Sequence, residues 1–164
     1  MDFEGGLSFD PKKKERIFAM VKPTLYALVV VSMLLGPAAR TEKKVILPPG
    51  AKPSGNWSYG ILADGTLYVS GMGGEDANGK IPATFEAEVQ QSLDNIDRVL
   101  KAAGMSSADV VSAQVYLTNR DTFSRMNKVY TSYFKDPRPT RTTVVVAGLV
   151  GDGHIEITVT AKKS

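Results

Sequence analysis

The sequence contains no cysteine and only one histidine, His154, and both shortages limit its chemistry. Without cysteine the chain has no disulfide, no thiolate nucleophile and no cysteine-based metal site. A single imidazole argues against a histidine-cluster metal site and against a Ser-His-Asp triad. We therefore expect no metal, and we interpret His154 as a surface or structural residue.

The chain also lacks a long apolar run and a large excess of charge. The apolar segment at residues 25–36 has twelve residues, whereas a helix needs about twenty to cross a bilayer, so we expect no stable membrane span. The net charge of +3 supplies no strong basic patch, so nucleic acid is not an expected partner. A hydrophobic content of 43% with 23% charged residues is typical of a soluble globular protein.

The first 39 residues have the pattern of a secretory signal peptide. A basic run precedes the apolar segment, and small residues near Ala39 form a plausible cleavage site. Translation could start at Met1 or at Met20, and the second start gives a more usual signal length. We expect an N-terminal extension at 1–39, cleaved near Ala39, and a folded domain at 40–164, which would be exported or periplasmic. The alternative interpretation of the segment is a buried or interface helix.

The remaining residues alternate between strand and helix patterns. Strand patterns occur at 43–47, 58–63, 66–71, 111–117, 141–147 and 154–160, and helix patterns occur at 84–103 and 121–134. Asp64 and Gly65 predict a tight hairpin turn, and the glycine-rich segment at 71–79 predicts a flexible loop. This order favours an α+β fold in which one sheet carries two helices on a single face. Self-association would then cover the other face.

Residues 139–161 form the segment with the most informative pattern. The β-branched run at 141–147 predicts a strand buried on both faces, and the alternation at 154–160 predicts a second strand after a glycine-rich turn. Arg141 opens the first strand, and Glu156 lies on the polar face of the second. Such a pair could bind a small carboxylate and orient a water molecule, or it could be a structural salt bridge between strands.

Several motifs resemble those of the Rid (reactive intermediate deaminase, RidA/YjgF-like) family. They are LYVSG at 67–71, QSLDNIDRVLKAAG at 91–104, DVVSAQVYLTN at 109–119, MNKVYTSYF at 126–134, PTRTTVVVAGL at 139–149 and HIEITVTA at 154–161. They occur in the family's order over residues 43–163. The fifteen-residue spacing from Arg141 to Glu156 also agrees with the family pattern.

This resemblance implies a chorismate-mutase-like α+β fold and a homotrimer with clefts between subunits. It also implies a deaminase-type hydrolase that acts on small 2-imino and enamine acids such as 2-aminoacrylate, 2-iminopropanoate and 2-iminobutanoate. The products would be a 2-keto acid and ammonia, formed without a cofactor or metal. The usual location of the family is cytoplasmic, which is the alternative to export.

The resemblance further implies roles for individual residues. Arg141 would clamp the substrate carboxylate, because a guanidinium offers two parallel donors to it. Glu156 would hold and polarise the attacking water. Ser70 and Asn127 match positions that line the family's cleft. Alternatively, Ser70 only ends a strand and Asn127 is only a solvated helix residue.

Three features depart from the family pattern. Trp57 occupies a position where many members have tyrosine, and Thr143 one where cysteine or serine is common. The segment at 71–76, GMGGED, differs from the usual GQIP-like run. These changes retain the carboxylate clamp and affect the preference for the substrate side chain. A non-catalytic trimeric module that binds small carboxylates is the alternative function, and a ribonuclease has little electrostatic support.

Overall fold

The computed structural model describes residues 42–163, which lie within one compact unit. The predicted signal peptide and its cleavage near Ala39 fall outside these residues. The strands are β1 (Lys44–Ile46), β2 (Gly60–Ala63), β3 (Thr66–Val69), β4 (Met72–Gly73), β5 (Val110–Leu117), β6 (Thr140–Val145) and β7 (Ile155–Lys162); the α-helices are α2 (Phe85–Ala102) and α3 (Phe123–Tyr133). Short 3₁₀ helices cover Ser107–Asp109 and Arg120–Thr122. Among the described residues, no helix has the length and apolar character needed to cross a membrane.

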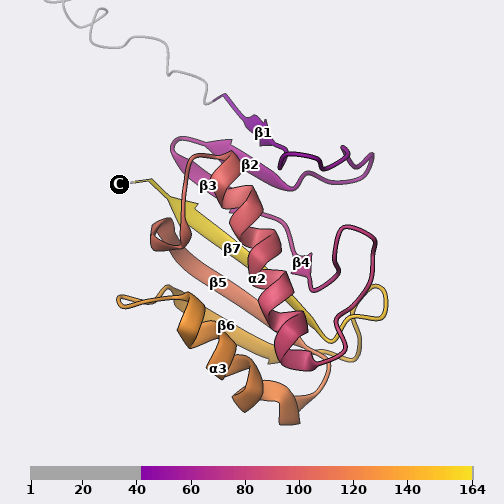
Figure 1. The fold of residues 1–164 in the computed structure, drawn as a ribbon. Helices are drawn as coiled ribbons and strands as arrows, with labels where there is room; N and C mark the ends of the chain where they lie inside the picture. Colours follow the sequence, from indigo (N-terminus) through magenta and orange to yellow (C-terminus); the bar gives the residue numbers. More distant parts are fainter. Residues whose placement is uncertain (1–41, 164) are drawn as a thin grey trace, which may run out of the picture. The chain divides into compact units, whose positions relative to one another are not determined.

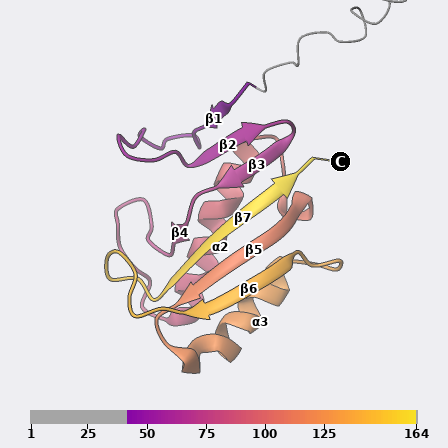
Figure 2. The same ribbon diagram turned by 180° about the vertical axis from the view of Figure 1, so that it is seen from behind.

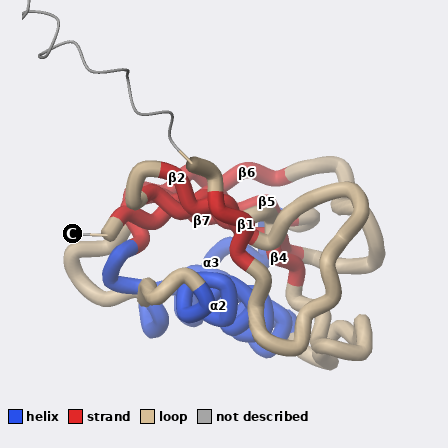
Figure 3. Tube along the Cα trace, turned by 90° about the horizontal axis from the view of Figure 1, so that it is seen from above, coloured by secondary structure: helices blue, strands red, loops and turns tan. Residues whose placement is uncertain are grey.

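All the described strands belong to one mixed sheet, in the order β1-β2-β3-β7-β5-β6, with β4 pairing to β7. Both α-helices cover the same face of this sheet, in front of it in Figure 1 and behind it in Figure 2. Figure 3 shows the resulting two layers, strands on one side and helices on the other. The predicted α+β fold with two helices on one face is confirmed.

Helix α2 forms where the sequence places its apolar stripe. The hydroxyl of Thr84 caps its first turn by accepting the backbone N–H of Ala87 at 3.3 Å. Its buried apolar residues are Val89, Leu93, Ile96, Val99 and Leu100, which recur at helical spacing. They pack on the helix-facing side chains of the sheet and build most of the core with them.

The hairpin between β2 and β3 also forms as predicted. Asp64 and Gly65 both have positive φ angles, 49° and 68°, and they join the paired residues Ala63 and Thr66. Two consecutive left-handed residues match the twist of a two-residue hairpin.

Strands β6 and β7 follow one another in the chain but are not neighbours: β5 lies between them, parallel to β6 and antiparallel to β7. Two sequence predictions about the sheet are wrong. Strand β6 is the edge of the sheet and is not buried on both faces: Val145, for example, is 52% exposed. In addition, β4 lies within the segment predicted as a flexible loop, since Met72 and Gly73 pair with β7.

Candidate functional site

Arg141 and Glu156 lie on opposite faces of the sheet. Arg141 is in register with Ala113 of β5, which is buried on the helix side. In β7 the buried residues Ile155 and Ile157 flank Glu156, so Glu156 points to the open face. No salt bridge joins the two among the described residues, and the structural ion pair considered as the alternative is wrong.

Arg141 contacts helix α3 through aromatic rings and a sulfur atom. Its guanidinium carbon lies 4.5 Å from the ring centre of Tyr130 and 5.8 Å from that of Phe123. One guanidinium nitrogen is 4.0 Å from the sulfur of Met126. No carboxylate pairs with Arg141 in the part of the chain that the structure describes. Ring faces attract the cation without using its hydrogen-bond donors, and the sulfur contact involves one nitrogen only, so the other donors of Arg141 are left for an anion.

The elements that carry and contact this arginine, β6 and α3, also carry buried polar atoms without hydrogen-bond partners. Besides Oη of Tyr133, these atoms are Oδ1 of Asn127, Oη of Tyr130 and Oγ1 of Thr143. Thr143 follows Arg141 on the same face of β6, and the other two residues belong to α3. Burial raises the pKa of Tyr130, against the opposing effect of nearby arginines, so its phenol stays protonated at neutral pH. We call this region the arginine cluster; buried polar atoms are normally paired, so its unpaired oxygens are available to a bound polar group.

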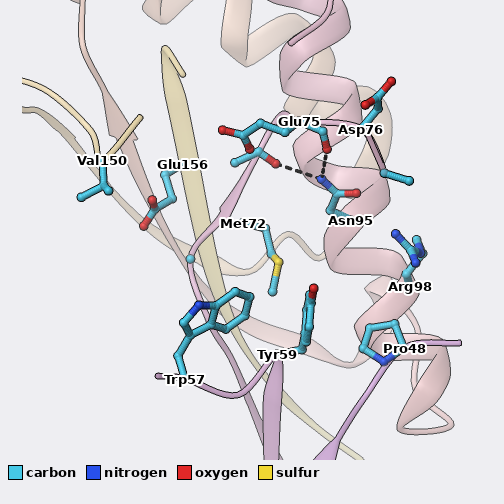
Figure 4. Close-up of a pocket in the computed structure, with 13 residues that line it drawn as sticks. Pro48, Trp57, Tyr59, Met72, Glu75, Asp76, Asn95, Arg98, Val150 and Glu156 are labelled. Carbon is cyan, nitrogen blue, oxygen red and sulfur yellow. Dashed lines mark hydrogen bonds between the residues drawn. The ribbon is translucent and has the colours of Figure 1, made fainter. Parts of the chain in front are cut away.

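Glu156 lies at a cavity of about 450 Å³ on the other side of the molecule (Figure 4). Figure 4 shows the side chains of Glu156 and Trp57 on one side of the cavity and those of Asn95 and Arg98 on the other. The side chain of Met72 lies between the two sides. Trp57 is 47% exposed and stacks at a tilt on Tyr59, with the ring centres 4.6 Å apart. We call this region, lined by Trp57, Tyr59, Gly71, Met72 and Glu156 among others, the glutamate pocket.

The backbone of Gly71 packs directly against the carboxylate of Glu156. A Cβ atom added at Gly71 would lie 2.0 Å from Oε1 of Glu156, so the backbone and the carboxylate occupy adjoining space. Strand β4 continues this contact, because Gly73 pairs with Glu156. The first glycine of the unusual GMGGED segment therefore has a steric reason.

Ser70 uses its hydroxyl inside the protein. Its Oγ donates to the carbonyl of Ser58 at 2.7 Å, and its N–H donates to the carbonyl of Tyr59 at 3.1 Å. These bonds fix the segment that carries Trp57. Ser70 is not among the residues that line the glutamate pocket.

The predicted site residues thus separate into two groups. Arg141, Asn127 and Thr143 belong to the arginine cluster, Trp57 and Glu156 line the glutamate pocket, and Ser70 supports the latter. Sequence reasoning missed the contact of Tyr130 with Arg141. Its position three residues after Asn127, on the same side of a helix, was the available signal. No group of metal-ligating side chains gathers among the described residues.

Comparisons with known proteins agree on one family. The sequence matches the family described as Endoribonuclease L-PSP over residues 49–163. A RutC family protein of Sulfurisphaera tokodaii is 42% identical over 114 residues, which cover 68% of this chain and 91% of that protein. A Bos taurus protein named 2-iminobutanoate/2-iminopropanoate deaminase is 41% identical, covering 63% of this chain and 77% of that protein. The crystal structure of YyfA from Yersinia pestis, a Rid protein of unknown function, has a TM-score of 0.71 at 33% identity and covers 74% of this chain and 100% of that one.

Proposed function

The chain belongs to the Endoribonuclease L-PSP, or YjgF/Rid, family, as its motifs predict, and from this membership we propose that it hydrolyses 2-imino acids to 2-keto acids and ammonia. Relatives named 2-iminobutanoate/2-iminopropanoate deaminase, at 37–41% identity, support an enzyme of this kind. The substrates would be small 2-imino acids and their enamine tautomers, such as 2-aminoacrylate, and the reaction would use no cofactor.

The observation that carries this proposal is the half-buried Arg141 without an acidic partner. A guanidinium held by ring faces keeps most of its donors, all but the one toward Met126, for the two oxygens of a planar carboxylate. Binding the carboxylate at two points fixes the adjacent imine carbon in place. The partly buried residues Thr143, on the same face of β6, and Asn127, on α3, each add one unpaired buried oxygen.

The reaction itself needs a base next to the imine carbon. Glu156 would accept a proton from water as the oxygen attacks this carbon and return it to the nitrogen, giving a neutral tetrahedral amino alcohol. The proton of the new hydroxyl then passes to the nitrogen through Glu156 as the carbon–nitrogen bond breaks, which releases ammonia and leaves the 2-keto acid. A positioned general base typically contributes 10²–10⁴-fold.

We further propose that each site takes its two groups from two chains of a homotrimer. Since Arg141 and Glu156 face opposite sides of one sheet, they cannot reach the same small molecule within a chain. The open face and the edge strand β6 expose apolar side chains, including Tyr68 and Val144, which a neighbouring chain would cover. The arginine cluster of one chain would then meet the glutamate pocket of the next.

A coupled assay on the full chain tests this function. A pyridoxal-phosphate dehydratase generates 2-aminoacrylate, and release of the keto acid is followed with wild type and with Arg141→Ala. We expect wild type to accelerate release and Arg141→Ala to lose about 100-fold or more in kcat/KM. Arg138→Ala is the matched control, because Arg138 pairs with Asp136 at the surface. Equal rates for wild type and Arg141→Ala would contradict the proposal.

A non-catalytic module that binds small carboxylates is the second candidate. The separation of the two groups favours it, since the arginine cluster can bind an anion without Glu156. The matched variant is Glu156→Gln, examined by calorimetry with a 2-keto acid. Binding by wild type and variant, without turnover by either, would establish the module, whereas loss of turnover in the variant alone establishes the deaminase.

A further inference from the structure

Helix α2 turns a row of polar side chains toward the sheet, where apolar ones are expected. Glu88 and Ser92 are 1% and 0% exposed, and Asn95 is partly buried. Their spacing of four and three residues places them on one side of the helix. A carboxylate is almost never fully buried unless its oxygens have partners, so the partners of Glu88 indicate what the row does.

Glu88 binds the residue that precedes strand β7. Its Oε1 accepts the backbone N–H of His154 at 2.6 Å, and its Oε2 lies 2.9 Å from Nδ1 of the same residue. The His154 side chain is largely exposed, so the buried carboxylate fixes the backbone at this point. Glu156 follows two residues later.

The other two residues of the row bind strand β4 and its continuation. Ser92 donates to the carbonyl of Met72 at 2.8 Å. Asn95 donates to the carbonyls of Gly73 and Glu75, at 3.0 and 2.9 Å, as the dashed lines in Figure 4 show. These bonds hold the strand that pairs with Glu156.

Glu88 also contacts this second segment directly. A Cβ atom added at Gly74 would lie 2.4 Å from Cγ of Glu88 and 2.5 Å from its carbonyl oxygen. The backbone at Gly74 therefore packs against Glu88 without space for a side chain. One residue thus contacts both backbone segments that border Glu156.

We propose that Glu88 is a positioning residue for Glu156, an inference that rests on the proposed function. The carboxylate of Glu156 forms no hydrogen bond or ion pair among the described residues, so its place depends on the backbone beneath it and on the wall at Gly71. Glu88 determines that backbone through His154 and Gly74. Small displacements of a reacting group are costly for rate, and the row on α2 prevents them.

Of the two contacts between Glu88 and His154, the one to the backbone N–H, rather than the one to the imidazole, positions Glu156. His154→Ala removes the ring and keeps the N–H, so it should leave the reaction unchanged. Glu88→Gln keeps an acceptor for the N–H and supplies a donor for Nδ1. Glu88→Leu keeps the approximate volume and leaves the N–H without a partner.

These variants are tested in the full chain by steady-state kinetics and by amide hydrogen exchange. We expect Glu88→Leu to lower kcat about tenfold or more with KM changed by less than about twofold, because the arginine cluster is untouched. Glu88→Gln and His154→Ala should stay within about threefold of wild type. Asp94→Asn, on the exposed side of α2 where Asp94 accepts a hydrogen bond from Gln90, is the control. Exchange should accelerate at 72–75 and 154–157 in Glu88→Leu only.

Two results would overturn the inference: Glu88→Leu with wild-type kcat, or a Gln variant as slow as the Leu variant. Hydrogen exchange separates this inference from the proposed function, because it requires no turnover. An inactive wild type in which exchange at 154–157 rises for Leu and not for Gln would overturn the deaminase and support the positioning of Glu156. Unchanged exchange in Glu88→Leu would overturn the positioning even in an active enzyme.

Discussion

The arginine cluster and the glutamate pocket hold their charged groups in different ways. Arg141 lies on an edge strand and rests on aromatic rings, and the elements that carry and contact it have buried polar atoms without partners. Glu156 lies on the interior strand β7, against a glycine backbone that helix α2 holds through hydrogen bonds. One chain therefore fixes the carboxylate by itself, whereas it leaves polar atoms of the arginine cluster unpaired. In the proposed trimer, the arginine cluster is therefore the half of the site that depends on a neighbouring chain.

The strongest test of this comparison mixes two inactive variants. Arg141→Ala and Glu156→Gln chains, unfolded and refolded together, should form trimers in which one cleft combines an intact arginine with an intact glutamate. Each variant alone should lose about 100-fold or more of kcat/KM, and the mixture should recover about a quarter of wild-type activity if assembly is random and cyclic. The coupled assay measures the recovery.

The matching control replaces the second chain by the double variant. Arg141→Ala mixed with Arg141→Ala/Glu156→Gln contains no intact arginine and should remain inactive. A mixture of the two single variants that also remains inactive, despite confirmed exchange of subunits, would show that the groups act within one chain.

Gly71→Ala disturbs the glutamate pocket alone and should have the next largest effect. The new methyl group would occupy the space of the Glu156 carboxylate, which is the far end of a flexible side chain and can move away. We expect kcat to fall about 10- to 100-fold while the melting temperature changes little. Gly148→Ala, where an added Cβ meets nothing within 4 Å, is the control. Wild-type kcat in Gly71→Ala would show that the position of the carboxylate is not critical.

The smallest effect concerns the ion pair that connects helices α2 and α3. Arg125 of α3 binds both carboxylate oxygens of Glu86 on α2, at 2.6 Å each, and this lowers the pKa of Glu86 to about 2. A lowered pKa stabilises the folded protein above the unfolded value of 4.5, and that contribution disappears as the pH falls through about 2.

Thermal melts of wild type and Glu86→Gln across this range measure the contribution. We expect a small difference at pH 7, because the pair is exposed and screened by salt, and none below about pH 2. The kcat should not change, since neither residue touches the arginine cluster or the glutamate pocket. A difference that persists in acid would contradict the ionic origin of the effect.

Local patterns in the sequence predicted the elements well. The apolar stripe of α2 and the Asp64–Gly65 turn each depend on residues close together in the chain, and both form as predicted. The motif around Arg141 likewise indicated the family. These features need only short-range information, which a sequence contains in full.

Pairing between strands was beyond this reasoning. Strands β6 and β7 follow one another in the chain, yet β5 lies between them, and alternation within a strand does not tell which face it shares with another strand. The β-branched run of β6 indicated burial, and in a single chain it forms an exposed edge. The contact of Glu88 with His154 joins residues 66 positions apart, and no local pattern predicts it.

Trp57 gives the glutamate pocket a fluorescence signal of its own. It is the only tryptophan in the sequence, it is about half exposed, and it lines the cavity that Glu156 borders. At wavelengths that only indole absorbs, the fluorescence therefore comes from this one residue, without background from the core. The colour and intensity of that emission respond to the water and charge around the ring, so occupancy of the pocket can be followed in the unmodified protein without a label.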